Sequence, residues 1–322
     1  MSPLSDDARR AARRAGRGAT ALALVAWCLV VLGALVRAHG AGLACPDWPL
    51  CFGDAIPEFD LRIAFEWGHR ALAGSVSIAL VGLAAYVLRT RALRERFLRP
   101  LAVIFAVLGV QILLGALTVL LGLAPWTVTA HLLTGNAFVI SLSWLAFALL
   151  ESARPVAPER VQVPAGVARI VAACAALVVL QLALGGLVAS HYAGLACSTF
   201  PLCNGDSLAP SLTGPIGLHV LHRLNAYAVA ASIGLLAWRT RGLGRLGAIA
   251  RVAFGLVLIQ VAVGAANVLL QLPVEVTGAH SALATAIALA TALLVREVVS
   301  ARAVARSHAP SSGRGIALEG VR

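Results

Sequence analysis

Residues 42–53 read Gly-Leu-Ala-Cys-Pro-Asp-Trp-Pro-Leu-Cys-Phe-Gly, and residues 194–205 read Gly-Leu-Ala-Cys-Ser-Thr-Phe-Pro-Leu-Cys-Asn-Gly. The second stretch repeats the first at an offset of 152 positions. An internal repeat of this kind predicts that the chain folds as two similar halves. Further matches at nearly the same offset surround it; they are His69-Arg70 with His222-Arg223, His131 with His280, and Gln111-x-x-x-Gly115 with Gln260-x-x-x-Gly264.

The composition is that of a membrane protein. Apolar residues make up 60% of the 322 residues and charged residues only 12%, which is too little polar surface for a soluble domain. Membrane-spanning helices need about 20 apolar residues, and continuous apolar runs favour helices over the alternating strands of a barrel. Eight stretches qualify: 19–37, 62–88, 101–123, 127–150, 165–189, 216–238, 248–270 and 275–296.

The net charge of +12 indicates an orientation rather than a nucleic-acid partner. All 26 basic residues are arginine, and 22 of them fall on one side of the membrane if the N-terminus is cytoplasmic. This bias is the positive-inside pattern. We therefore expect an all-α integral membrane protein with eight transmembrane helices, arranged as two pseudo-symmetric four-helix bundles with both termini in the cytoplasm.

The spans and the repeat predict five segments along the chain. We expect a cytoplasmic N-terminal tail (1–18), an N-terminal four-helix half (19–150), a cytoplasmic linker (151–164), a C-terminal four-helix half (165–297) and a disordered cytoplasmic tail (298–322). Four helices return the chain to its starting side, so the two halves have parallel topology.

Four histidines are the candidate ligands. His69 and His131 lie about 8–10 Å below the outer surface if each residue rises ~1.5 Å, and His222 and His280 occupy the matching depth. Ionisable residues within spans are functional candidates. Two imidazoles on facing helices suit axial ligation of a haem iron in a bundle core, whereas zinc requires three or four converging ligands. The sequence thus predicts two haem sites.

The neighbours of these histidines differ between the halves. Arg70 and Arg223 follow the first histidine of each pair, where a guanidinium could bind a haem propionate or extend to the interface. Glu66 lies one helical turn before His69, whereas its counterpart is His219. An acid in one half alone suggests that this half performs the chemistry; the alternative is an interfacial glutamate.

The long outer loops each carry two cysteines separated by five residues, so a Cys45–Cys51 and a Cys197–Cys203 disulfide are feasible in an oxidising compartment. Such a disulfide could hold the loop over the haem edge. Alternatively, it could be redox-active and exchange electrons with a thiol-disulfide partner.

The eight spans and these motifs together resemble the haem A synthase family over about residues 20–297. That family oxidises the C8 methyl group of haem O to a formyl group, which gives haem A for cytochrome oxidase. The resemblance implies that His69 and His131 hold the substrate haem, with Glu66 as the essential acid and Cys45–Cys51 as the loop disulfide. It also implies a permanent haem b bound through His222 and His280.

Two other classes of protein remain alternatives: a quinol-linked di-haem b electron-transfer cytochrome, and a haem carrier or assembly protein. The contrast between Glu66 and His219 disfavours the cytochrome, whereas a carrier needs only reversible ligation of the haem. The expected partners of a synthase are membrane lipid, a haem O synthase that delivers the substrate, and an electron acceptor or donor. A homo-oligomer is compatible with this interpretation, and the expected location is a bacterial plasma membrane.

Overall fold

The computed structural model describes residues 4–155, 162–205 and 207–308, without the side chains of 303–308. In these ranges the chain forms eight long α-helices and no strand, which confirms the predicted all-helical fold. Each helix is long and apolar enough to cross a membrane. They are α1 (Asp6–Ala38), α2 (Leu61–Arg89), α3 (Arg91–Leu120), α4 (Pro125–Ser152), α5 (Ala165–Ser190), α6 (Gly214–Arg239), α7 (Gly244–Leu269) and α8 (Val274–His308), with a short 3₁₀-helix at Ala193–Leu195.

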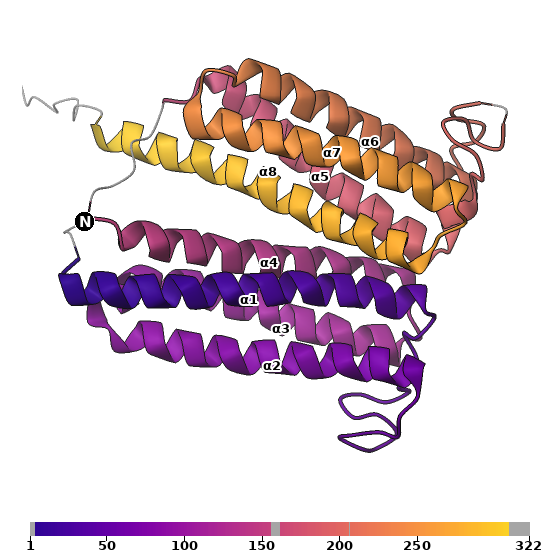
Figure 1. Ribbon diagram of the computed structural model, residues 1–322, viewed down its shortest axis with the longest axis horizontal. Helices are drawn as coiled ribbons and strands as arrows, with labels where there is room; N and C mark the ends of the chain where they lie inside the picture. Colours follow the sequence, from indigo (N-terminus) through magenta and orange to yellow (C-terminus); the bar gives the residue numbers. More distant parts are fainter. Residues whose placement is uncertain (1–3, 156–161, 206, 309–322) are drawn as a thin grey trace, which may run out of the picture.

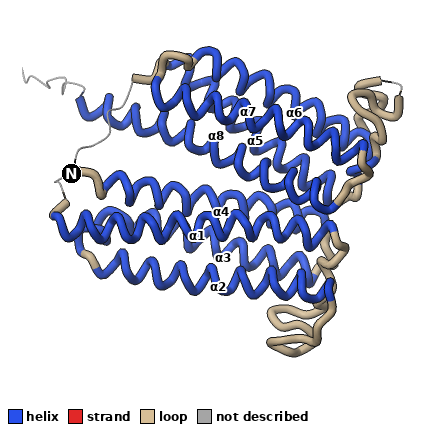
Figure 2. The backbone as a smooth tube through the Cα atoms, viewed as in Figure 1, coloured by secondary structure: helices blue, strands red, loops and turns tan. Residues whose placement is uncertain are grey.

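The helices form two groups that lie side by side, α1–α4 and α5–α8 (Figure 1). Between the groups, α1 contacts α8, and α4 contacts both α5 and α8. The Trp27 indole nitrogen donates to the carbonyl of Ala282 at 3.1 Å across this boundary. Farther along it, Arg296 donates to both carboxylate oxygens of Glu151 at 2.8 and 2.6 Å. The two long loops leave the bundles at the same end, opposite the N-terminus (Figure 2).

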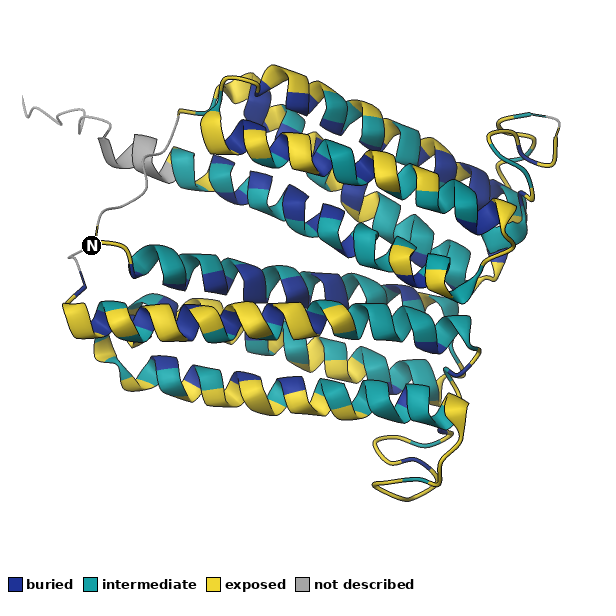
Figure 3. Cartoon of the chain, in the orientation of Figure 1, coloured by how far each residue is buried: buried dark blue, intermediate teal, exposed yellow. Residues whose placement is uncertain are grey.

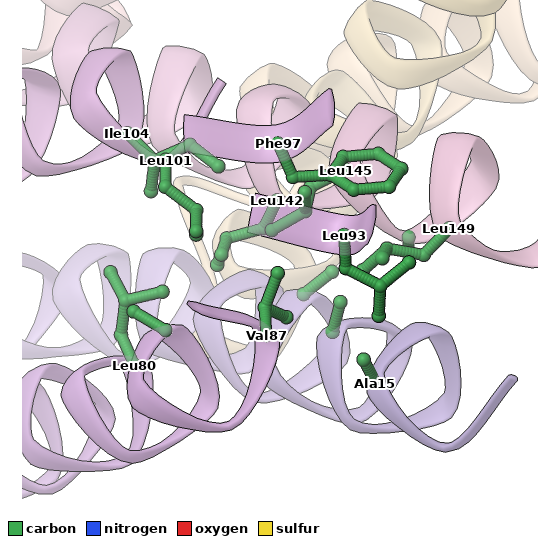
Figure 4. Packing of buried hydrophobic residues seen from close by; sticks show 14 of the residues in the cluster. Ala15, Leu80, Val87, Leu93, Phe97, Leu101, Ile104, Leu142, Leu145 and Leu149 are labelled. Atoms are coloured by element: carbon green, nitrogen blue, oxygen red, sulfur yellow. The ribbon is translucent and has the colours of Figure 1, made fainter. Parts of the chain in front are cut away.

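Each group has its own core. In the first, leucines of α2, α3 and α4 interlock with small residues of α1, as at Leu80, Leu93, Leu142 and Ala15 (Figure 4). A second cluster of buried residues lies between 167 and 298. Many residues on the outward faces are exposed (Figure 3), and large apolar side chains such as Ile78 are among them. Exposed apolar helix faces are suited to lipid, where the helical backbone satisfies its own hydrogen bonds.

Several helices extend beyond the predicted apolar spans. Helix α1 begins at Asp6 rather than near residue 19, because Ser5 caps the Ala8 N–H and Asp6 and Asp7 occupy the first turn, where acidic groups favour a helix. Helix α8 continues to His308, so residues 298–308 of the expected disordered tail are helical. Residues 309–322 of that tail and 156–161 of the linker lie outside the described residues.

The two outer loops contain small disulfide rings, Cys45–Cys51 and Cys197–Cys203. In the first ring, the carboxylate of Asp47 accepts the N–H groups of Phe52 and Gly53 at 2.7 and 2.8 Å. Hydrogen bonds from Gly53 and then Phe52 hold the pKa of Asp47 below its ordinary value. In the second ring, the Thr199 hydroxyl accepts the Gly205 N–H at 2.9 Å, so an uncharged group makes the corresponding contact.

Candidate functional site

All four candidate histidines pack their rings against a glycine of the preceding helix. A Cβ atom added to any of these glycines would lie 3.0–3.2 Å from the Cε1 atom of the ring, which is tighter than nearly all real contacts. A larger residue at any of these positions would therefore require the imidazole to move by a few tenths of an ångström. The pairs are Gly33 with His69, Gly115 with His131, Gly185 with His222, and Gly264 with His280.

The histidine side chains carry unused polar atoms in the bundle interiors. The Nδ1 atoms of His69, His131 and His280 are buried and have no hydrogen-bond partner, which is rare for buried polar atoms and asks for an explanation. His69 and His131 lie on helices of the first group, and His222 and His280 on helices of the second. Two paired imidazoles in each bundle fit the axial ligands of a haem iron.

Glutamines lie one turn before three of the four glycines. The Gln111 amide nitrogen donates to Nε2 of His131 at 3.3 Å. The Gln181 amide nitrogen lies 3.2 and 3.3 Å from the two ring nitrogens of His222, and that of Gln260 donates to the main-chain carbonyl of His280 at 3.0 Å. The fourth position, before Gly33, is Leu29.

The internal repeat identified Gln111 and Gln260, because their Gln-x-x-x-Gly units match each other. The structure divides the two roles: glycine packs against the ring and glutamine makes the polar contact. Sequence comparison of the halves missed Gln181, because its counterpart Leu29 is apolar.

Glu66 is buried, with 4% of its surface exposed, and lies at the junction of α2 and the first disulfide ring. One carboxylate oxygen accepts the Cys45 N–H at 2.8 Å, and the other accepts Arg70 at 2.6 Å. Arg70 also donates to the carbonyls of Cys45, Asp47 and Leu50 at 2.6–3.0 Å. Glu66 and Arg70 together attach the ring to the helix that carries His69.

The second half makes the corresponding attachment with different residues. Nδ1 of His219 lies 3.4 Å from the Cys197 nitrogen and 3.0 Å from the Ala193 carbonyl oxygen. Arg223 donates to the carbonyls of Cys197 and Leu202 at 3.0 and 3.4 Å. Both arginines therefore contact loop carbonyls, and their binding of propionates stays a prediction. His219 takes the place of Glu66 against the first cysteine of its loop.

The comparisons with known proteins agree with the predicted resemblance. The sequence model of the COX15-CtaA family, described as cytochrome oxidase assembly protein, matches residues 17–64 and 56–293. The chain is similar to the haem A synthase of Shewanella oneidensis, with 30% identity over 79% of this chain and 87% of that protein. It is also similar to the haem A synthase of Symbiobacterium thermophilum, with 32% identity over 73% of this chain and 77% of that protein. This multi-pass membrane protein therefore belongs to the COX15-CtaA family of cytochrome oxidase assembly proteins.

Proposed function

We propose that the chain is a haem A synthase, which oxidises the C8 methyl group of haem O to the formyl group of haem A. The similar proteins carry that name. The observation that carries the proposal is the position of Glu66, a buried carboxylate one helical turn from His69 on α2. This arrangement sets a carboxylate beside a candidate haem ligand in the first bundle, whereas the corresponding position of the second bundle is His219.

The two bundles take different haems in this proposal. His69 and His131 bind the substrate haem O in the N-terminal half, and His222 and His280 bind haem b in the C-terminal half. Support comes from the four glycine-packed imidazoles and the unpartnered Nδ1 atoms of His69, His131 and His280. A bound haem b would supply a one-electron redox centre, through which electrons pass between the substrate site and an external partner.

Glu66 is the proton acceptor of the reaction. Conversion of a methyl group to a formyl group removes four electrons; it passes through an alcohol and then a gem-diol, which loses water. Each oxidation releases protons at the substrate carbon, and a positioned carboxylate accepts them or orients the oxygen donor. Arg70 and the Cys45 N–H hold the Glu66 carboxylate in place through hydrogen bonds of 2.6 and 2.8 Å.

A second candidate function is a di-haem b electron-transfer cytochrome. One observation favours it: Glu66 and His219 contact the nitrogen of the first cysteine in their respective loops. If this contact were the whole role of Glu66, both halves would be electron-transfer sites without carbon chemistry.

The Glu66→Gln variant separates the two functions. We expect it to retain its haems and to produce no haem A, because the amide keeps the size of the side chain and cannot accept the proton. Glu95→Gln is the control, because Glu95 is an exposed residue of α3 that pairs with Arg91 of the same helix. Extracted haems are identified by chromatography, and normal haem A content in Glu66→Gln would refute the proposed role.

The proposed setting is a bacterial plasma membrane with the long loops on the outer side. A haem O synthase is the proposed source of the substrate, and a membrane electron acceptor or donor completes the redox balance. The disulfide rings of the outer loops are the proposed contact for a thiol-disulfide partner.

A further inference from the structure

One face of α1 lies against the interior of the first bundle, and it ends on an arginine. Arg37 lies one helical turn beyond Gly33, the glycine against which the His69 ring packs, at the end of α1 that leads into the first long loop. It continues a series of buried or inward-packed residues spaced three and four positions apart, which is the spacing of one helix face. The series is Ala19, Ala23, Ala26, Val30 and Gly33.

The guanidinium of Arg37 has hydrogen-bond donors to offer. It is partly buried, and among the residues that the structure describes neither a hydrogen-bond acceptor nor a carboxylate contacts it. A guanidinium presents its N–H donors in a planar fork that matches a carboxylate. At Arg70, by contrast, loop carbonyls and Glu66 already take four hydrogen bonds. The donors of Arg37, unlike most of those of Arg70, are therefore available to a ligand.

The second bundle lacks this positive charge. The residue one turn beyond Gly185 on α5, where the His222 ring packs, is Ala189. The extra arginine thus belongs to the bundle that also contains Glu66.

A tyrosine from the second half holds the guanidinium in place. Arg37 lies over the Tyr192 ring at 4.6 Å from its centroid, a contact that leaves the N–H groups in the guanidinium plane unused. Tyr192 has a φ of 54°, which L side chains rarely adopt, whereas its counterpart in the repeat, with a φ of 62°, is Gly40. Such strained residues persist where surrounding contacts hold them, and they occur often at ligand clamps.

We propose that Arg37 binds a propionate carboxylate of the substrate haem in the N-terminal half, with Tyr192 as its positioning residue. The inference rests on the proposed function, in which His69 and His131 hold that haem. The propionates are the charged edge of an otherwise apolar macrocycle, so they point toward the nearer aqueous side, which is the end of the bundle where Arg37 lies. Arginine–carboxylate pairs are frequently bidentate and are among the stronger hydrogen-bonded pairs.

The Arg37→Gln variant tests the contact, because glutamine stays polar and loses both the charge and the fork. Purified full-length protein is titrated with haem O and, separately, with haem O dimethyl ester, in which both carboxylates are blocked. We expect Arg37→Gln to bind haem O about 10- to 150-fold more weakly than the unmodified protein and to bind the ester equally well. Arg62→Gln is the matched control, because Arg62 is an exposed arginine at the same end of the bundle, and its haem O affinity should not change. Equal losses for haem O and the ester, or no loss for haem O, would overturn the inference.

Two substitutions of Tyr192 decide the matter if Arg37→Gln does not fold. Tyr192→Phe keeps the aromatic face and should leave the haem O affinity unchanged. Tyr192→Leu removes that face and should weaken haem O binding about two- to fivefold, with ester binding unchanged. Equal haem O affinities in these two variants would overturn the inference. Failure of the proposed function looks different: the unmodified protein would then take up no haem O at this site and would titrate like His69→Ala, which contradicts both.

Discussion

The glycine beneath His131 offers a quantitative test of the site. In Gly115→Ala the new Cβ atom would lie 3.0 Å from Cε1 of His131, whereas ordinary contacts begin at 3.4 Å. The ring must therefore move by about 0.4 Å. In the same helix, Gly109 has nothing within 4 Å of its added Cβ atom, so Gly109→Ala is the matched control.

The two variants separate packing from helix propensity. Both gain up to about 1 kcal/mol from replacing glycine in a helix, but overpacking costs about 1–3 kcal/mol at Gly115 alone. If this cost falls on the ligating position of the ring, haem affinity in the N-terminal half drops about 5- to 150-fold relative to Gly109→Ala.

Haem occupancy supplies the measurement. Titration of the purified variants with haem O, followed by electron paramagnetic resonance of the low-spin iron, reports both affinity and axial geometry. We expect a weaker and shifted low-spin signal for Gly115→Ala and an unchanged one for Gly109→Ala. Equal affinities and identical spectra would refute the conclusion that this glycine seats the His131 ring.

Three further predictions concern the loops and the boundary between the helix groups. Because the pKa of Asp47 is lowered, this carboxylate stabilises the loop fully above the ordinary carboxyl pKa, and the contribution is lost as pH falls through the folded pKa. The protection of the loop amides from hydrogen exchange should therefore fall in acid. In Asp47→Asn this protection should not change over the same pH range. Arg296→Met should destabilise the protein by about 2 kcal/mol, because Glu151 loses two charge-assisted hydrogen bonds. Combining it with Glu151→Gln should restore part of the lost Tm. Reduction of the Cys45–Cys51 disulfide should lower the free energy of unfolding by about 2 kcal/mol, as measured by unfolding with and without dithiothreitol. A protein in which serine replaces Cys45 and Cys51 should lose less stability when dithiothreitol is added, and an equal loss would contradict this prediction.

The resemblance of the two halves predicted four candidate ligands, which stay predictions, together with a contrast between Glu66 and His219. Glu66 differs chemically from His219, yet each contacts the backbone nitrogen of the first cysteine in its loop. The sequence could not reveal this shared contact, because each loop folds back onto its helix through bonds between residues about 20 positions apart.

The sequence by itself predicted eight apolar segments, which are helices long enough to span a membrane in the structure, and it predicted the two halves and the four candidate histidines. Apolar length is a local property, since a membrane span must satisfy its backbone hydrogen bonds within one helix, and repeated residues can be found by alignment alone. The tertiary structure decided which groups touch the imidazoles: glycines beneath all four rings, and glutamine amides beside His131 and His222. These contacts join neighbouring helices, and they depend on how each helix is rotated toward the next, which the spacing along one helix does not specify.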